Sequence, residues 1–295
     1  MRRGSRKNLI NPLLSLGFFA ALACSFSLLT SLYGAVFESN GLGARSAGMG
    51  SSFAAIPGSY ESVFWNPAGI AKLSDKTFHS EYRDLYGLGL LRYFTAGYVH
   101  PGIGRGAIGF SWLKLDTVGA ASFLDYTENT LVLSYGMEIM SNLCIGINGK
   151  FYRVNSSVGA GGQGLDLGVQ YTWAGLTLGG AVQDATRTVV TWDSGAKDMI
   201  PRRLSLGFSR QFFTNTLLTS QMGWQNETNF SFRQGIEQQM FNKTVNLRLG
   251  AIEQNKDWRF AWGVGIRVKI ISLDYAWERQ RLLGDSQVFS AAIRF

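Results

Sequence analysis

The residues from Trp258 to Ile270 alternate between large apolar side chains and small or cationic ones. Side chains on a β-strand point alternately to opposite sides, so a period of two gathers the apolar groups on one face and the cations on the other. A helix would mix the two sets. The pattern predicts one long strand whose faces are Trp258, Phe260, Trp262, Val264, Ile266, Val268 and Ile270 on one side and Arg259, Ala261, Gly263, Gly265, Arg267 and Lys269 on the other.

The same alternation recurs from residue 77 to the end of the chain. It predicts about fourteen strands of roughly ten residues each, which is the length that crosses a bilayer at a tilt. We expect these strands at 77–83, 90–100, 106–115, 126–138, 143–154, 164–173, 176–184, 202–212, 217–225, 230–240, 245–254, 258–268, 271–278 and 287–295.

The connections between the expected strands alternate in length. Short turns at 101–105, 139–142, 174–175, 213–216, 241–244 and 269–270 interleave with links that are often longer, at 84–89, 116–125, 155–163, 185–201, 226–229, 255–257 and 279–286. Bacterial outer-membrane barrels have short periplasmic turns and longer external loops, whereas a soluble sandwich has no reason to sort its loops in this way. The alternation within a strand does not separate a membrane barrel from a soluble one, but the sorted loops favour the membrane barrel.

Cations and aromatic residues agree with this interpretation. An arginine or lysine on the lipid face near the bilayer midplane costs roughly 2 to 4 kcal/mol, so Arg259, Arg267 and Lys269 are expected to face the lumen. Tyr171, Trp173, Phe212 and Phe295 then lie near the periplasmic interface and Trp258 and Trp277 near the outer one, as in aromatic girdles. The expected fold class is all-β, a transmembrane antiparallel β-barrel.

The first 35 residues are typical of an export signal. A basic stretch is followed by an apolar stretch from Leu13 to Leu32 and by the small residues Gly34 and Ala35. A retained helical anchor and lipidation at Cys24 are the alternatives. Export, together with the barrel, predicts the outer membrane of a didermal bacterium, with outer-membrane lipids around the wall.

The basic charge does not point to nucleic acid. The formal net charge is +8, but half of it comes from the four basic residues among the first seven, and the other cations are not interleaved with aromatics in a patch. The two cysteines and two histidines form no metal-ligand spacing, and His79 and His100 have no serine motif beside them. We therefore expect no nucleic acid, no metal, no cofactor and no enzymatic activity.

Residues 36–75 lack the period of two and are rich in glycine, alanine and serine. Gly41, Gly43, Gly48 and Gly50 do not have the spacing of a phosphate-binding loop, and no strand precedes them. Small residues permit close packing and tight bends, which suit a segment folded inside a barrel, and Asn66–Pro67 predicts a turn. The expected organisation is a signal peptide at 1–35, an internal segment at 36–75 and a barrel at 76–295.

These residues carry a family resemblance. Gly41-Leu42-Gly43-Ala44-Arg45, Gly48-Met49-Gly50 and Phe64-Trp65-Asn66-Pro67-Ala68-Gly69-Ile70-Ala71, ahead of a wall of about fourteen strands, resemble the FadL-like outer-membrane transport superfamily. The longer motif looks closest to its PorV-like and spirochaete-type branches. The resemblance implies an N-terminal hatch inside the barrel, with Asn66, Pro67, Ala68, Gly48 and Gly50 as its elements.

Two functions follow from the resemblance. The first is passive uptake of long-chain fatty acids or other hydrophobic small molecules, with Arg248, Arg259 and Arg267 as candidate lumen partners for a carboxylate; pairing with lumen acids such as Asp274 and Glu278 is the alternative role of these arginines. The second is a PorV-like structural or secretion role, in which the barrel docks partner proteins; short external loops favour it. A terminal Phe295 resembles the signal that outer-membrane assembly machinery recognises.

Overall fold

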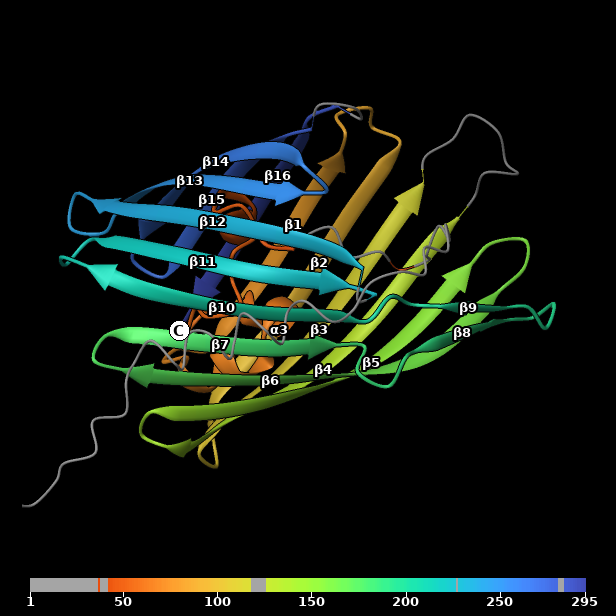
Figure 1. The fold of residues 1–295 in the computed structure, drawn as a ribbon, viewed down its shortest axis with the longest axis horizontal. Coiled ribbons are helices and arrows are strands. Elements are labelled where there is room, and N and C mark those ends of the chain that lie inside the picture. Colours follow the sequence, from red (N-terminus) through yellow and green to blue (C-terminus); the bar gives the residue numbers. More distant parts are fainter. Residues whose placement is uncertain (1–36, 38–41, 118–125, 227, 281–283) are drawn as a thin grey trace, which may run out of the picture. The chain divides into compact units, whose positions relative to one another are not determined.

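The wall of the molecule is a closed β-barrel (Figure 1). The computed structural model describes Phe37 and residues 42–117, 126–226, 228–280 and 284–295, so the expected signal peptide lies outside the described residues. Within those residues the wall has fourteen strands, each antiparallel to its neighbours. The first and last strands close it by pairing Thr77 with Arg294 and Asp84 with Gln287.

The wall strands follow one another around the barrel in chain order. They are β1 (Thr77–Leu85), β2 (Leu91–Ile103), β3 (Gly106–Thr117), β4 (Thr127–Met140), β5 (Leu143–Asn155), β6 (Ala160–Trp173), β7 (Leu176–Gln183), β10 (Arg203–Phe212), β11 (Thr216–Gln225), β12 (Asn229–Met240), β13 (Val245–Gln254), β14 (Asp257–Val268), β15 (Ile271–Arg279) and β16 (Ser286–Arg294). Their positions confirm the expected strands to within a few residues.

The main difference from the expectation concerns the longest external loop. It contains a hairpin of β8 (Val189–Trp192) and β9 (Lys197–Met199), and β6 starts at Ala160, which pairs with Val154 of β5 and with Trp192 of the hairpin. Runs of four and three residues are too short to display a period, so the sequence pattern did not reveal them.

The two faces of each strand have the predicted environments. On β14 the outward side chains Trp258 and Phe260 are 51% and 58% exposed, whereas Ala261 is 4% exposed and faces the interior. Outward apolar side chains recur on every wall strand, which gives the barrel an apolar surface far larger than a soluble protein exposes. The short turns and the C-terminus lie at one end, the short-turn end, and the longer links lie at the other, the long-loop end.

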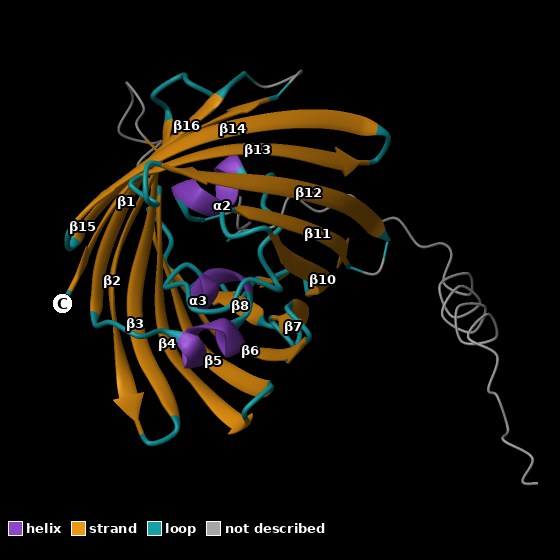
Figure 2. Ribbon diagram, turned by 90° about the vertical axis from the view of Figure 1, so that its left-hand side faces the viewer, coloured by secondary structure: helices purple, strands orange, loops and turns teal. Residues whose placement is uncertain are grey.

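Residues 42–75 fill the middle of the barrel, and we call them the internal segment. They include α2 (Ala44–Gly48), α3 (Ser62–Trp65) and the 3-10 helix η1 (Pro67–Lys72), and Figure 2 shows these helices enclosed by the strands. This confirms the predicted position of an N-terminal segment inside the lumen. No helix among the residues described has both the length and the apolar character needed to cross a membrane.

The core of the molecule lies between the internal segment and the wall. Phe53, Ile56 and Ile70 are at most 2% exposed, and they cluster with Val99 and Val132 of the wall. Because many apolar side chains of the wall point outward, the internal segment supplies nine of the fifteen buried residues of this cluster. The lumen is therefore a packed interior at this level.

Candidate functional site

Asn66 joins the internal segment to the wall. Its side-chain amide donates hydrogen bonds to the carbonyl oxygens of Ala54 (2.6 Å) and Val169 (3.0 Å), and its carbonyl oxygen accepts from the Ala68 backbone N–H (3.1 Å). The last bond caps η1, where Pro67 takes the first helical position that suits a residue without an N–H. The predicted turn at Asn66–Pro67 is present, and Asn66 is fully buried.

Glycines of β4–β7 form a seat for this part of the internal segment. A Cβ atom at Gly136 would come within 2.6 Å of the Pro67 carbonyl oxygen. A Cβ at any of three further wall glycines would overlap the backbone of Pro67 or Ala68, the Asn66 amide, or the backbone of Ala54; these glycines are Gly146, Gly168 and Gly179. Only glycine permits this approach of backbone to backbone.

A second seat lies on the opposite side of the lumen, on β12–β14. A Cβ at Gly48 would lie 3.0 Å from the Cα of Gly263, and a Cβ at Gly235 would lie 2.5 Å from the Met49 carbonyl oxygen. Gly50 has a φ of +62° and packs against Gly250 so closely that a Cβ on either residue would collide with backbone. Gly48 and Gly50 are two of the hatch residues that the resemblance implies. Their backbone contacts the wall closely because they have no side chain.

The sequence contains a signal for these seats. The seat glycines occupy inward positions and pair with one another across strands, Gly136 with Gly146, Gly146 with Gly168, and Gly235 with Gly250. Inward glycines that recur at one level of neighbouring strands mark the place where something must approach the wall.

Ion pairs tie the internal segment to β12, β13 and β15. The Arg45 guanidinium lies 2.7 Å from Glu237, Arg248 lies 2.7 Å from the other oxygen of Glu237, and Arg248 also lies 2.7 Å from Asp274. Side chains of Glu237 and Arg248 are 2% and 3% exposed. At such burial an unpaired charge is costly, so each member of this network stabilises the others.

The three candidate arginines have different surroundings. Arg248 belongs to the network just described, and Arg259 lies 2.9 Å from Glu278 and donates to Gln254. Arg248 and Arg259 therefore pair with acids of the lumen, which is the alternative role that the sequence allows for them. Arg267 forms no ion pair with any described residue, and its Nε has no hydrogen-bond partner there.

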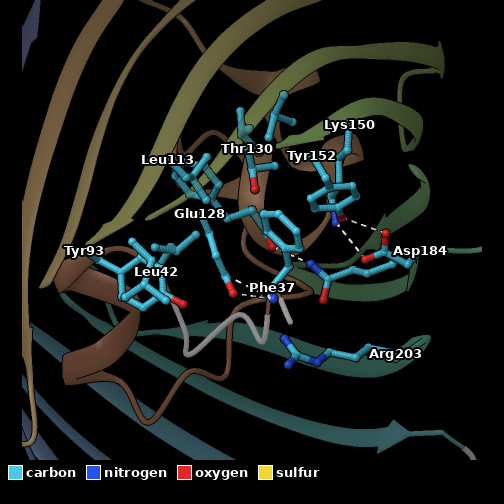
Figure 3. A pocket seen from close by; sticks show the side chains of 15 residues that line it. Phe37, Leu42, Tyr93, Leu113, Glu128, Thr130, Lys150, Tyr152, Asp184 and Arg203 are labelled. Atoms are coloured by element: carbon cyan, nitrogen blue, oxygen red, sulfur yellow. Dashed lines mark hydrogen bonds and ion pairs between the residues drawn. The ribbon is translucent and has the colours of Figure 1, made fainter. Parts of the chain in front are cut away.

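An apolar cavity lies at the long-loop end of the lumen, beside β2–β5 (Figure 3). Its volume is about 60 Å³, and Leu42, Phe64, Leu113 and Val132 contribute apolar walls. The Phe37 ring lies in it, 4.7 Å from the Tyr152 ring, and the Phe37 backbone N–H donates to both oxygens of Glu128 at 3.1 Å. The cavity as it stands is smaller than one that holds a benzene ring, because Phe37 occupies part of the space.

The rim of the apolar cavity carries charged groups that pair with one another. Lys150 lies 2.8 Å from Asp166 and 3.2 Å from Asp184, and the Tyr152 hydroxyl donates to Asp184 at 2.7 Å. These groups satisfy one another, so the cavity offers an incoming molecule mainly apolar contact.

His79 has a neighbour that the sequence did not indicate. Its Nε2 lies 3.4 Å from the Ser111 hydroxyl, and its ring stacks on Tyr60 at 4.7 Å. The His79 and Ser111 side chains are buried in the packed core, and neither lines the apolar cavity. The described residues contain no group of histidine, cysteine, aspartate and glutamate side chains with the arrangement of a metal site.

Comparison by sequence finds no matching family model and no characterised protein that matches. Solved structures do match. A deltaS2 mutant of TodX, a monoaromatic hydrocarbon channel, superposes with a TM-score of 0.68 at 13% identity, over 88% of this chain and 100% of that one. TodX is the toluene transporter of Pseudomonas putida.

Two further solved proteins give the same result. The toluene transporter TbuX of Ralstonia pickettii has a TM-score of 0.63 at 16% identity, covering 88% of this chain and 100% of TbuX. A FadL homologue of Pseudomonas aeruginosa has a TM-score of 0.62 at 14% identity, covering 85% and 97%. At these identities the likeness establishes the fold. The chain is a closed fourteen-stranded barrel with the fold of the FadL-like channels.

Proposed function

We propose that the chain is an outer-membrane channel of a didermal bacterium that admits hydrophobic small molecules, with the internal segment as its hatch. The observation that carries this proposal is an apolar cavity at the long-loop end of a barrel that residues 42–75 otherwise fill. A molecule that enters this cavity meets the buried α3 and η1 next, so passage requires the internal segment to shift.

Two arguments favour small aromatic compounds over long-chain fatty acids as the cargo. The cavity already accommodates one aromatic ring, that of Phe37, among apolar side chains. Solved channels of this fold are named for toluene and for monoaromatic hydrocarbons. A ring of this size that displaces Phe37 would retain the contacts that Phe37 makes.

The internal segment is held in three ways. The glycine seats allow its backbone to approach the wall, hydrogen bonds and ion pairs such as those of Asn66 and Arg45 join it to the strands, and apolar side chains pack between it and the wall. The polar contacts can be exchanged for water when the segment moves.

A disulfide lock tests the hatch. The side-chain oxygens of Ser52 and Thr219 lie 2.9 Å apart, one on the internal segment and one on β11. The double variant Ser52→Cys, Thr219→Cys therefore places two thiols within reach of each other. Uptake of radiolabelled toluene by cells expressing the oxidised variant should fall to the level of cells without the protein, and dithiothreitol should restore it.

The single variant Ser52→Cys serves as the control, because it has the same new thiol without its partner, and the native Cys144 is buried. Equal uptake in the oxidised and reduced double variant would contradict the hatch. Uptake no higher than in cells without the protein, together with envelope proteins that co-purify with the barrel, would instead support the docking role.

The C-terminal residue supports a partner in assembly. The backbone of Phe295 pairs with Lys76 and its ring is 64% exposed at the short-turn end. We propose that this exposed aromatic terminus is what the outer-membrane assembly machinery recognises, and that Phe295→Ala lowers the amount of folded barrel in the membrane without changing the stability of the barrels that do form.

A further inference from the structure

Three neighbouring turns at the short-turn end each carry, on the turn or just before it, one cation and one large apolar side chain. They join β10 to β11, β12 to β13 and β14 to β15. All of these side chains are exposed, Phe213 by 91% and Phe241 by 73%. We call the six residues the basic sector: Arg210 with Phe213, Lys243 with Phe241, and Lys269 with Ile270.

Backbone hydrogen bonds hold the three turns side by side. The Asn215 carbonyl accepts from the Gln239 N–H of β12, and the Thr244 carbonyl accepts from the Arg267 N–H of β14, each at 2.8 Å. Consecutive turns are two strands apart, which corresponds to roughly 10 Å. Because lysine and arginine side chains are long, a group that lies between two turns is within reach of the cations of both.

Arg210 marks the edge of the apolar band on the outside of the barrel. Phe208 is exposed and Ser209 is buried, so the alternation along β10 directs Arg210 outward, to the surface that meets lipid. Its guanidinium lies over the Phe212 ring, 5.3 Å from the ring centre. An outward cation is costly at the midplane of a bilayer and costs little near the interface, so Arg210 belongs at the level of the lipid head groups.

The outward face changes from apolar to polar over a short distance here. Arg210 pairs in register with Leu218, and Leu218 pairs with Ile236, so apolar side chains of the wall extend to the level of the guanidinium. Two residues nearer the turns, the Thr216 hydroxyl donates to the side-chain oxygen of Gln238 at 2.6 Å. Such a surface fits an amphiphile that has a polar head at the turns and apolar chains against the wall.

The basic sector has no acidic residue beside its cations. Neither aspartate nor glutamate occurs in its three turns, residues 210–216, 240–245 and 268–271. The three cations form no ion pair with any residue that the structure describes. Three positive charges therefore lie together at the level of the head groups.

The rest of the short-turn end is different. Glu138 lies 2.5 Å from Lys72, and its backbone N–H donates to the Arg105 carbonyl at 2.9 Å. Asp75 directly precedes Lys76, and the turn between β6 and β7 contains no charged residue. The uncompensated charge is therefore confined to one side of the barrel, from β10 to β15.

We propose that the basic sector binds anionic phospholipids of the leaflet at the short-turn end. The phosphodiester lies between the cations of neighbouring turns, and the acyl chains lie on the outward face of β10–β15. Each cation near an anionic leaflet contributes about a fivefold preference for anionic lipid. The exposed Phe213 and Phe241 rings add apolar contact that does not depend on the head group. This inference concerns the outside of the barrel and does not depend on the hatch.

The lipid that the purified protein retains tests the binding. The protein is transferred from micelles with equal amounts of phosphatidylglycerol and phosphatidylcholine, and native mass spectrometry counts the bound lipids. We expect a preference for phosphatidylglycerol that falls about fivefold in Arg210→Gln and disappears when Lys243→Gln and Lys269→Gln are added. Lys256→Gln is the matched control, because Lys256 is exposed in a turn at the long-loop end. Its preference should equal that of the unmodified protein.

Inorganic phosphate in the same experiment distinguishes a lipid head group from a free anion. It should leave the bound phosphatidylglycerol in place. Displacement of the lipid would overturn the proposal and assign the basic sector to a free anion. Equal retention of the two lipids by the unmodified protein, or an equal loss in Lys256→Gln, would overturn it as well. Normal mobility of the unboiled variants on a gel checks that each barrel is folded.

Fluorescence quenching tests the place of binding. Thr214→Cys in the turn after β10 and Ala174→Cys in the turn after β6 are both exposed and accept a bimane label, whereas the native Cys144 is buried. Phosphatidylglycerol with a nitroxide near its head group should quench the label at 214 more strongly than the label at 174, and the corresponding phosphatidylcholine should quench both equally. Equal quenching by phosphatidylglycerol would overturn the assignment to β10–β15.

Toluene uptake separates this inference from the proposed channel. Arg210→Gln should change the lipid preference and leave uptake unchanged, because Arg210 lies on the outward face of the wall. The oxidised Ser52→Cys, Thr219→Cys variant should lose uptake and keep the lipid preference. A loss of the preference on oxidation would overturn the assignment to the outward face.

Discussion

Strands β3–β6 and β12–β15 lie on opposite sides of the lumen (Figure 2). The side chains that they present to it differ. The first group contributes Leu113 and Val132 to a mainly apolar cavity, whereas the second contributes Arg233, Arg259 and Arg267 to cavities that are lined by several arginines. Both groups carry glycine seats at the level of the internal segment. The wall thus holds the internal segment in the same way on both sides. The inward side chains of the two sides differ only toward the ends of the barrel.

The largest effect is expected where a charge of the second group is paired. In Arg248→Met, Asp274 loses its ion pair and Glu237 loses one of two, so the free energy of unfolding should fall by about 3 to 5 kcal/mol, as for a broken buried ion pair. Arg267→Met, in which no ion pair is broken, should change it by less than about 0.5 kcal/mol. Denaturation in detergent followed by tryptophan fluorescence measures both, and equal losses would mean that Arg267 is also paired.

The seat on the first group gives the next largest effect. A valine at Gly146 would overlap the backbone of Pro67 and Ala68, and such overpacking costs about 3 kcal/mol. Gly149→Val is the control on the same strand, because a side chain there meets open space. The temperature at which the fast-migrating folded form disappears from an unboiled gel should drop for Gly146→Val alone. An equal drop in both variants would attribute the loss to the strand and not to the seat.

Asn66→Ala should destabilise less, by about 2 kcal/mol, because it removes three hydrogen bonds but adds no overlap. It should also raise toluene uptake, since the hatch loses its contact with β6. Asn155→Ala, at the exposed end of β5, should change neither quantity. A stability loss without any change in uptake would separate the Asn66 contacts from the movement of the hatch.

The smallest effect is expected for the exposed ion pair between Lys114 and Asp116, 3.1 Å apart on the rim of the first group. Both side chains are more than a third exposed, so Lys114→Ala should cost no more than about 0.5 kcal/mol, and less in high salt. Urea denaturation at two salt concentrations measures this. A loss as large as that of Arg248→Met would remove the distinction between the two sides of the lumen.

The wall could be predicted from the sequence because a period of two is a local property. The character of the Trp258 and Arg259 side chains indicates which face of the strand each lies on, whatever the neighbouring strands are. The lengths of the turns indicate the two ends of the barrel. The same pattern indicates that Arg248 can pair with Asp274 and Arg259 with Glu278, because all four residues lie on inward positions of neighbouring or nearby strands.

The contacts between the internal segment and the wall could not be predicted in this way. Arg45 and Glu237 are separated by 192 positions in the sequence, and nothing local to either residue indicates the other. The wall glycines of the seats are not distinctive one by one, because an absent side chain has the same appearance in the sequence whether it permits a bend or a close contact. The Phe37 side chain in the apolar cavity likewise depends on tertiary packing.

The pairing of β1 with β16 sets the order in which this molecule is built. The barrel cannot close until β16 pairs with β1, and by then the internal segment, which precedes every strand, has already been made. A segment packed on all sides has no entrance through a finished wall, so the wall has to wrap around it. Closure of the barrel therefore depends on contacts that are distant in sequence, which is expected to make it slow, and it requires an intact β16.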